Sequence, residues 1–170
     1  MSPVVSLPGG ARQALAATRF ELVSEWRFDT PIERIWGELT TPDSWPQWWR
    51  AVKAVKLLAE GDRDGIGAVR RFTWATALPY TLSFDMTATR IEPMSVLEGR
   101  ARGELDGTGL WTLRPEGDGT YVRYDWKIDI TRPWQVALAP VLRPAFAWNH
   151  NVVMGWGYED LKTRLIKTAN

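Results

Sequence analysis

Few side chains in this sequence are suited to acid–base or nucleophilic chemistry. His150 is the only imidazole, and therefore the only side chain whose unperturbed pKa lies near neutrality. It could donate to a ligand carbonyl or act as a general acid or base; the alternative is a partly buried histidine bonded to backbone or to a carboxylate. Tyr124 and Arg70 are the other candidates, for steadying an enolate or binding a carboxylate. Arg70 has the parity of Phe72 and Trp74, although an arginine at a strand end often extends to water instead.

The sequence has no motif for nucleophilic, nucleotide or metal chemistry. It contains no cysteine, which excludes disulfides, thiolate zinc sites, iron–sulfur clusters and thiol nucleophiles. A single histidine excludes the usual multi-histidine metal sites. Glycine-rich phosphate loops and EF-hand loops are absent, and we interpret Asp62 and Asp64 as turn formers. We therefore expect no metal ion and no cofactor.

Aromatic residues are the unusual feature of the composition, with 11 tryptophans, 5 phenylalanines and 4 tyrosines. Large rings in that number either fill a core or line a cavity. Alternation along the predicted strands brings eight large side chains to one face, which we expect to be concave. They are Phe72, Trp74, Leu82, Phe84, Met86, Trp111, Tyr124 and Trp126.

Length and charge limit the classes of protein. The chain has 170 residues, enough for one domain, and its 21 basic and 20 acidic residues leave a net charge of +1. This balance argues against a broad nucleic-acid-binding face. No apolar run is long enough for a membrane helix and no secretory signal is evident, so we expect no stable membrane insertion and a cytoplasmic location. We expect residues 1–18 to be a leader and 19–168 to form a single domain.

The elements that must position these side chains are mostly strands. Two short helices are expected between the first two strands, with Thr30 and Glu33 as a capping box and Pro46 interrupting the second helix. Asp106-Gly107 predicts a two-residue hairpin turn. The predicted strands cover Arg19–Phe28, Val52–Glu60, Ala68–Thr76, Tyr80–Glu92, Val96–Leu105, Thr108–Pro115 and Val122–Thr131.

Helices close the sequence. Trp134–Arg143 is expected to be a helix bounded by Pro140 and Pro144, followed by a long helix over Phe146–Lys167. The buried stripe of the long helix includes His150, Met154, Gly157 and Leu161. Gly155 and Gly157 are unfavourable in a helix, and either close packing or space left for a ligand would account for them.

With this order of elements, the chain resembles the START-like or Bet v 1-like superfamily, whose bacterial members are called SRPBCC or polyketide cyclase/dehydrase-like proteins. The resemblance implies an α+β helix-grip fold, in which a curved antiparallel sheet of about seven strands wraps around a long C-terminal helix. Proteins of this kind bind lipids, sterols, polyketides or plant hormones, and some cyclise or dehydrate polyketides. The segments that carry the resemblance are Asp29–Trp36, Trp45–Trp49, Leu78–Tyr80, Gly107–Leu113 and Ala139–Met154.

Three functions follow, and we favour the first. It is the binding of a small hydrophobic or aromatic molecule, lipid- or polyketide-like, by a monomer or weak homodimer. The second is a polyketide cyclase or aromatase with His150 as the catalytic acid or base. The third is a protein-interaction module, whose signature would be exposed Trp45, Trp48 and Trp49 and a filled interior. The residues expected to contact the ligand are Arg70, Phe72, Trp74, Phe84, Met86, Trp111, Tyr124, Trp126, His150 and Met154.

Overall fold

The computed structural model describes residues 18–168, which form a seven-stranded antiparallel sheet with helices between its first two strands and at its end. The expected leader lies outside the described residues, apart from Thr18. The helical elements are α2 (Ile32–Leu39), the 3-10 helix η1 (Pro42–Gln47) and α3 (Pro133–Lys167). The strands are β1 (Arg19–Phe28), β2 (Val52–Ala59), β3 (Val69–Ala75), β4 (Thr81–Glu92), β5 (Val96–Gly103), β6 (Leu105–Glu116) and β7 (Gly119–Ile130).

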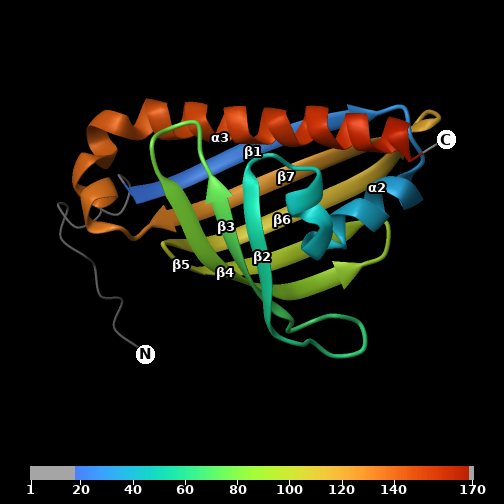
Figure 1. Cartoon of the computed structure of the whole chain (residues 1–170), viewed down its shortest axis with the longest axis horizontal. Helices are drawn as coiled ribbons and strands as arrows, with labels where there is room; N and C mark the ends of the chain where they lie inside the picture. The colour runs from blue at the N-terminus through green and yellow to red at the C-terminus, as the bar shows by residue number, and fades with distance from the viewer. Residues whose placement is uncertain (1–17, 169–170) are drawn as a thin grey trace, which may run out of the picture.

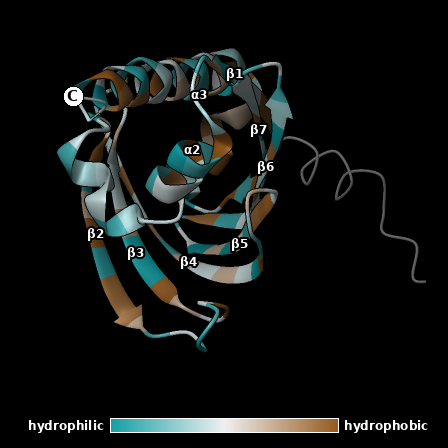
Figure 2. Cartoon of the chain, turned by 90° about the vertical axis from the view of Figure 1, so that its right-hand side faces the viewer, coloured by the Kyte–Doolittle hydropathy of each residue, from teal (hydrophilic) through white to brown (hydrophobic). Residues whose placement is uncertain are grey.

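The strand order, β1-β7-β6-β5-β4-β3-β2, places the first two strands at opposite edges of the sheet. Between them the sheet curls strongly, and α3 lies across its concave side (Figure 1). Viewed from one end, the sheet forms a cup with α3 over the rim and α2 across the near end (Figure 2). The predicted helix-grip α+β fold is therefore confirmed. None of the helices in residues 18–168 is long and apolar enough to cross a bilayer.

The predicted hairpin turn at Asp106-Gly107 is wrong. Strand β6 runs through both residues, and Ala101 pairs with Gly107, so the turn lies earlier, at Gly103 and Glu104. Gly107 is needed for a different reason: a Cβ there would lie 2.1 Å from the Lys127 carbonyl oxygen. The glycine permits close approach of β7 rather than reversing the chain.

Two expectations about helix ends also fail. The N-cap of α2 is Pro31, with no side-chain capping bond, and the Thr30 carbonyl instead accepts a 2.7 Å hydrogen bond from the Thr120 hydroxyl. Helix α3 is continuous through Pro140 and Pro144, where a break was predicted. These prolines are four residues apart and both exposed, so they share one face and bend α3 instead of ending it (Figure 1).

Three tryptophans in η1 and directly after it fill one end of the cup. Trp45, Trp48 and Trp49 are all buried, which removes the exposed cluster that an interaction module required. The Trp49 indole donates to the Val153 carbonyl at 3.1 Å. Gly157 lies directly against this ring, since a Cβ there would come within 2.4 Å of it. The glycine thus serves close helix packing, whereas nothing lies within 4 Å of a Cβ at Gly155.

Candidate ligand-binding site

A cavity of about 670 Å³ lies between the concave face of the sheet and α3. It is lined by residues from all seven strands and from all three helical elements. Strand periodicity and the helix stripe together bring all ten predicted ligand-contacting residues to its wall. These are Arg70, Phe72, Trp74, Phe84, Met86, Trp111, Tyr124, Trp126, His150 and Met154.

Part of the cavity wall is formed by rings that stack along a strand or across neighbouring strands. Trp111 and Tyr124 stack with centroids 4.1 Å apart and planes inclined by 25°. The Tyr124 ring also stacks on Trp126, at 5.7 Å and 22°. Farther along the sheet, Phe72 stacks on Phe84 at 6.2 Å and 21°. Neighbouring rings restrict one another in this arrangement, so the wall is preorganised for a ligand with apolar surface.

Two glycines make room for these side chains on the floor of the cavity. Gly99 and Gly109 pair with each other across β5 and β6, and both line the cavity. A Cβ at Gly99 would lie 2.5 Å from the Met86 sulfur, and one at Gly109 would lie 2.5 Å from the Tyr124 hydroxyl oxygen. The large side chains of the adjacent strands therefore lie over a floor without side chains. This role was not predicted from the sequence, because the local sequence around a strand glycine does not reveal which side chain of a neighbouring strand lies over it.

His150 reaches the cavity from α3 and contacts the edge strand β1. Its Nε2 lies 3.3 Å from the Ser24 hydroxyl oxygen. Burial lowers the pKa of His150 to about 4, so the imidazole is neutral at physiological pH. Ser24 is the polar exception among the inward-facing residues of β1, and this contact accounts for it.

Three further polar groups of the cavity wall lack partners among the described residues. The Tyr124 hydroxyl has no hydrogen bond there, and burial raises the pKa of the phenol, so it stays protonated. The Trp74 indole nitrogen is buried without an acceptor, and the Gln135 side-chain oxygen is buried without a donor. A bound molecule with a carbonyl or hydroxyl group would supply such partners.

Arg70 lies at the cavity wall but is already paired. Its Nε donates to the Asp43 carboxylate at 3.1 Å, and its side chain is 25% exposed. The predicted alternatives were an inward anion site and an extension to water. The ion pair to Asp43 differs from both, because it neutralises the guanidinium beside the cavity. Arg70 also lies far from His150 in the sheet. Arg70 is on β3, whereas His150 contacts Ser24 on β1, and these two strands are five positions apart in the strand order.

Several lining residues fall outside the predicted set. Phe20 and Leu22 of β1 share the inward parity of their strand, and this signal was available in the sequence. Asn149 is buried and accepts a 2.7 Å hydrogen bond from the Ala77 amide, which fastens the β3–β4 loop to α3. Gln135 belongs to the segment expected to form a separate helix. Its position at the cavity depends on the bend of α3, which the sequence pattern did not predict.

Family comparison agrees with this architecture. The family model described as polyketide cyclase/dehydrase and lipid transport matches residues 19–165. The chain belongs to this family. Its match spans the whole helix-grip sheet and nearly all of α3, so the family shares the elements that enclose the cavity. No curated protein matches the sequence.

Several solved structures share this fold. A START superfamily protein from Mycobacterium smegmatis superposes with a TM-score of 0.72 at 14% identity, covering 87% of this chain and 98% of its own. The Zhui aromatase/cyclase from Streptomyces sp. R1128 gives 0.71 at 11% identity, covering 89% and 96%. The protein TTHA0849 from Thermus thermophilus gives 0.70 at 17% identity, covering 88% and 99%. At these identities the likeness concerns the fold.

Proposed function

We propose that this protein binds a small hydrophobic or aromatic molecule, lipid- or polyketide-like, in the cavity under α3. The observation that carries the proposal is a mostly apolar cavity of about 670 Å³ whose wall includes many large aromatic side chains. This volume lies within the range of roughly 300–1,000 Å³ that is usual for small-molecule pockets. The family also includes proteins of lipid transport, which supports a ligand of this class.

The ten lining residues predicted from the sequence are the proposed contacts. The aromatic rings would supply buried apolar area, and the Tyr124 hydroxyl and Trp74 indole would orient the ligand through its oxygen atoms. His150 would face the ligand as a neutral imidazole. We further propose that the protein acts in the cytoplasm as a monomer or weak homodimer.

Native mass spectrometry of freshly purified protein, beside a denatured sample, tests the proposal. We expect a discrete excess mass that disappears on denaturation and is absent from a Leu82→Trp variant, because the larger ring occupies cavity volume. Leu58→Trp is the matched control, since Leu58 is 41% exposed and lies away from the cavity. An excess mass that persists equally in Leu82→Trp would place the bound molecule elsewhere.

A second candidate is cyclase- or dehydrase-type turnover with His150 as the base. The observation in its favour is the Ser24–His150 contact at the cavity, 3.3 Å long. Against it, an imidazole whose pKa is about 4 is a weak base at neutral pH. Pairing with Asp43 also reduces the ability of Arg70 to stabilise an enolate. Binding without turnover therefore ranks first. If His150→Gln retained the ligand but converted it more slowly than wild type, turnover would be favoured instead.

A further inference from the structure

Charge is distributed unevenly around the cavity. Of the described residues that line it, Arg70 is the only lysine or arginine, whereas the loop between β2 and β3 contributes Glu60, Asp62 and Asp64. These three acidic residues are exposed, so they lie where the cavity opens to solvent. An anion that approaches this opening therefore meets negative charge.

The Arg70 guanidinium is neutralised by Asp43 of η1. Both Nε and Nη2 of Arg70 lie 3.1 Å from the Asp43 Oδ2. Helix η1 is held against β3, because the ring of Trp45 packs on Phe72 with centroids 5.6 Å apart. Asp43 itself is not among the lining residues. A carboxylate outside the cavity thus holds the guanidinium that a ligand anion would otherwise pair with.

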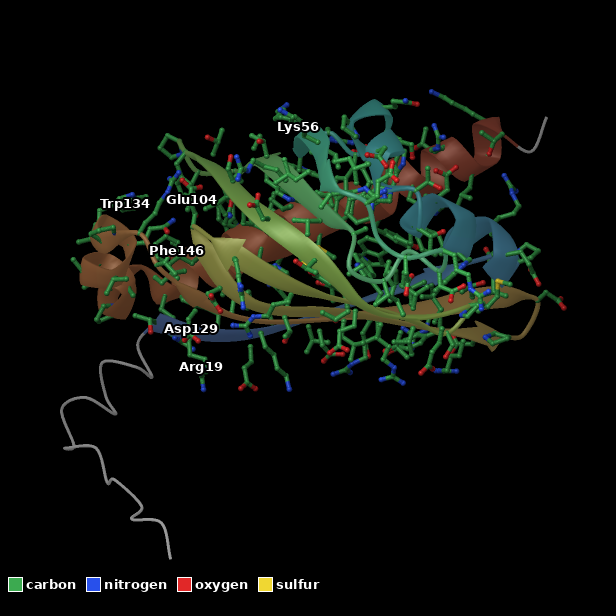
Figure 3. The ribbon with its side chains drawn as sticks, turned by 90° about the horizontal axis from the view of Figure 1, so that it is seen from below. Arg19, Lys56, Glu104, Asp129, Trp134 and Phe146 are labelled. Carbon is green, nitrogen blue, oxygen red and sulfur yellow. The ribbon has the colours of Figure 1, made fainter. Side chains whose placement is uncertain are left out.

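Basic residues of the edge strands lie on the outer side of the sheet. Lys56 of β2 and Arg19 of β1 are exposed there and do not line the cavity (Figure 3). The next residues along these strands, Leu57 and Phe20, do line it, as strand alternation requires. His150 is neutral at physiological pH, because burial lowers its pKa to about 4. A bound anion would therefore find no unpaired cation among the described lining residues.

The unpaired polar groups of the cavity suit an uncharged ligand instead. Among the described residues, the Trp74 indole N–H lacks an acceptor and the Gln135 side-chain oxygen lacks a donor. A hydroxyl group can satisfy either of them, since it both donates and accepts, whereas a carboxylate only accepts. Burying an anion without a cation also costs far more than burying a hydroxyl group whose hydrogen bonds are made.

We propose that the cavity selects uncharged hydrophobic molecules over anions of the same shape, and that the Arg70–Asp43 ion pair determines this selectivity. The selectivity rests on the proposed ligand binding and narrows its class to neutral alcohols, phenols or ketones, as opposed to ionised carboxylic acids. Asp43 determines specificity without contacting the ligand, because its carboxylate already occupies the one arginine of the described cavity wall.

Two fluorescent probes that share one aromatic frame test this selectivity. N-phenyl-1-naphthylamine is uncharged, and 8-anilinonaphthalene-1-sulfonate is the same frame with a sulfonate group. We expect wild type to bind the anionic probe at least about tenfold more weakly than the neutral probe. Only fluorescence that Leu82→Trp reduces is assigned to the cavity, because the larger ring occupies cavity volume.

Asp43→Asn tests the role of the ion pair, since it removes the charge and keeps the size of the side chain. Affinity for the anionic probe should rise about three- to tenfold, because the Arg70 guanidinium is no longer neutralised. Affinity for the neutral probe should stay within about twofold of wild type, which also reports that the fold is intact. Asp118→Asn is the matched control and should change neither affinity, because Asp118 is exposed in the β6–β7 turn and does not line the cavity.

The remaining outcomes separate this selectivity from ligand binding itself. Equal affinity of wild type for the two probes would overturn the selectivity and leave ligand binding in place. An unchanged affinity of Asp43→Asn for the anionic probe would overturn the role of the ion pair, because the added volume of the sulfonate would then account for the difference. Absence of saturable binding of the neutral probe would contradict the proposed function, and the selectivity with it.

Discussion

The Tyr124 hydroxyl is a polar group that the fold places at the cavity without a partner among the described residues. Replacing it in Tyr124→Phe removes no internal hydrogen bond there, so we expect the free energy of unfolding to be unchanged or slightly raised. Affinity for an oxygen-containing ligand should fall about two- to tenfold, the equivalent of one neutral hydrogen bond. Ligand titration followed by tryptophan fluorescence measures this change.

Tyr121→Phe provides the matched control for the tyrosine experiment. The Tyr121 hydroxyl hydrogen bonds to Glu25, and the residue does not line the cavity. Its loss should leave ligand affinity unchanged. If both tyrosine variants bound like wild type, the Tyr124 hydroxyl would not contact the ligand.

The buried imidazole of His150 predicts a specific pH dependence of stability. Burial lowers its pKa from 6.5 to about 4, and the unfolded chain therefore binds more protons between these values. The free energy of unfolding should therefore keep its full value above about pH 6.5. It should decrease as the pH falls toward 4, by at most about 3 kcal/mol. Urea unfolding of wild type and His150→Gln across this range isolates the effect, because other titrating groups are common to both. Parallel curves for the two proteins would contradict the lowered pKa.

At the scale of elements, two glycines of α3 make opposite predictions. Gly157 packs against the Trp49 ring, which is fixed by its bond to the Val153 carbonyl, so Gly157→Ala should destabilise the fold by about 1–3 kcal/mol. Gly155 is exposed with no heavy atom within 4 Å of a Cβ, so Gly155→Ala should stabilise it by up to about 1 kcal/mol. Chemical denaturation of both variants checks the pair. Equal effects would mean that Trp49 can move aside.

Strands in which buried and exposed residues alternate could be predicted from the sequence. Turns and bends that depend on close contact with another element could not. The bounds of β1 agree with the prediction because buried and exposed residues alternate along it. The turn before β6 was misplaced because Gly107 is required by the backbone of β7, a partner that the local sequence does not reveal. Similarly, Pro140 and Pro144 bend α3 without ending it, since the bent helix still packs on the sheet.

At the scale of the molecule, the hollow interior is the property that the sequence could not establish. Periodicity brought the aromatic residues to one face, but a filled core and a lined cavity need the same residues. The difference depends on curvature and on the facing glycines Gly99 and Gly109, which leave the floor between strands without side chains. Burying about 200–300 Å² of apolar ligand surface would contribute about 5–8 kcal/mol before entropy losses. This gives micromolar affinity at best from apolar burial alone.

Fluorescence titration with N-phenyl-1-naphthylamine, an apolar probe, is the most direct test of the central claim that the cavity accepts a hydrophobic molecule. We predict saturable enhancement at micromolar concentration with one site for wild type and for the surface control Leu58→Trp. Leu82→Trp should reduce the affinity at least tenfold, because its added ring occupies the cavity. Absence of saturable binding by wild type, or equal binding by the folded Leu82→Trp protein, would contradict the account.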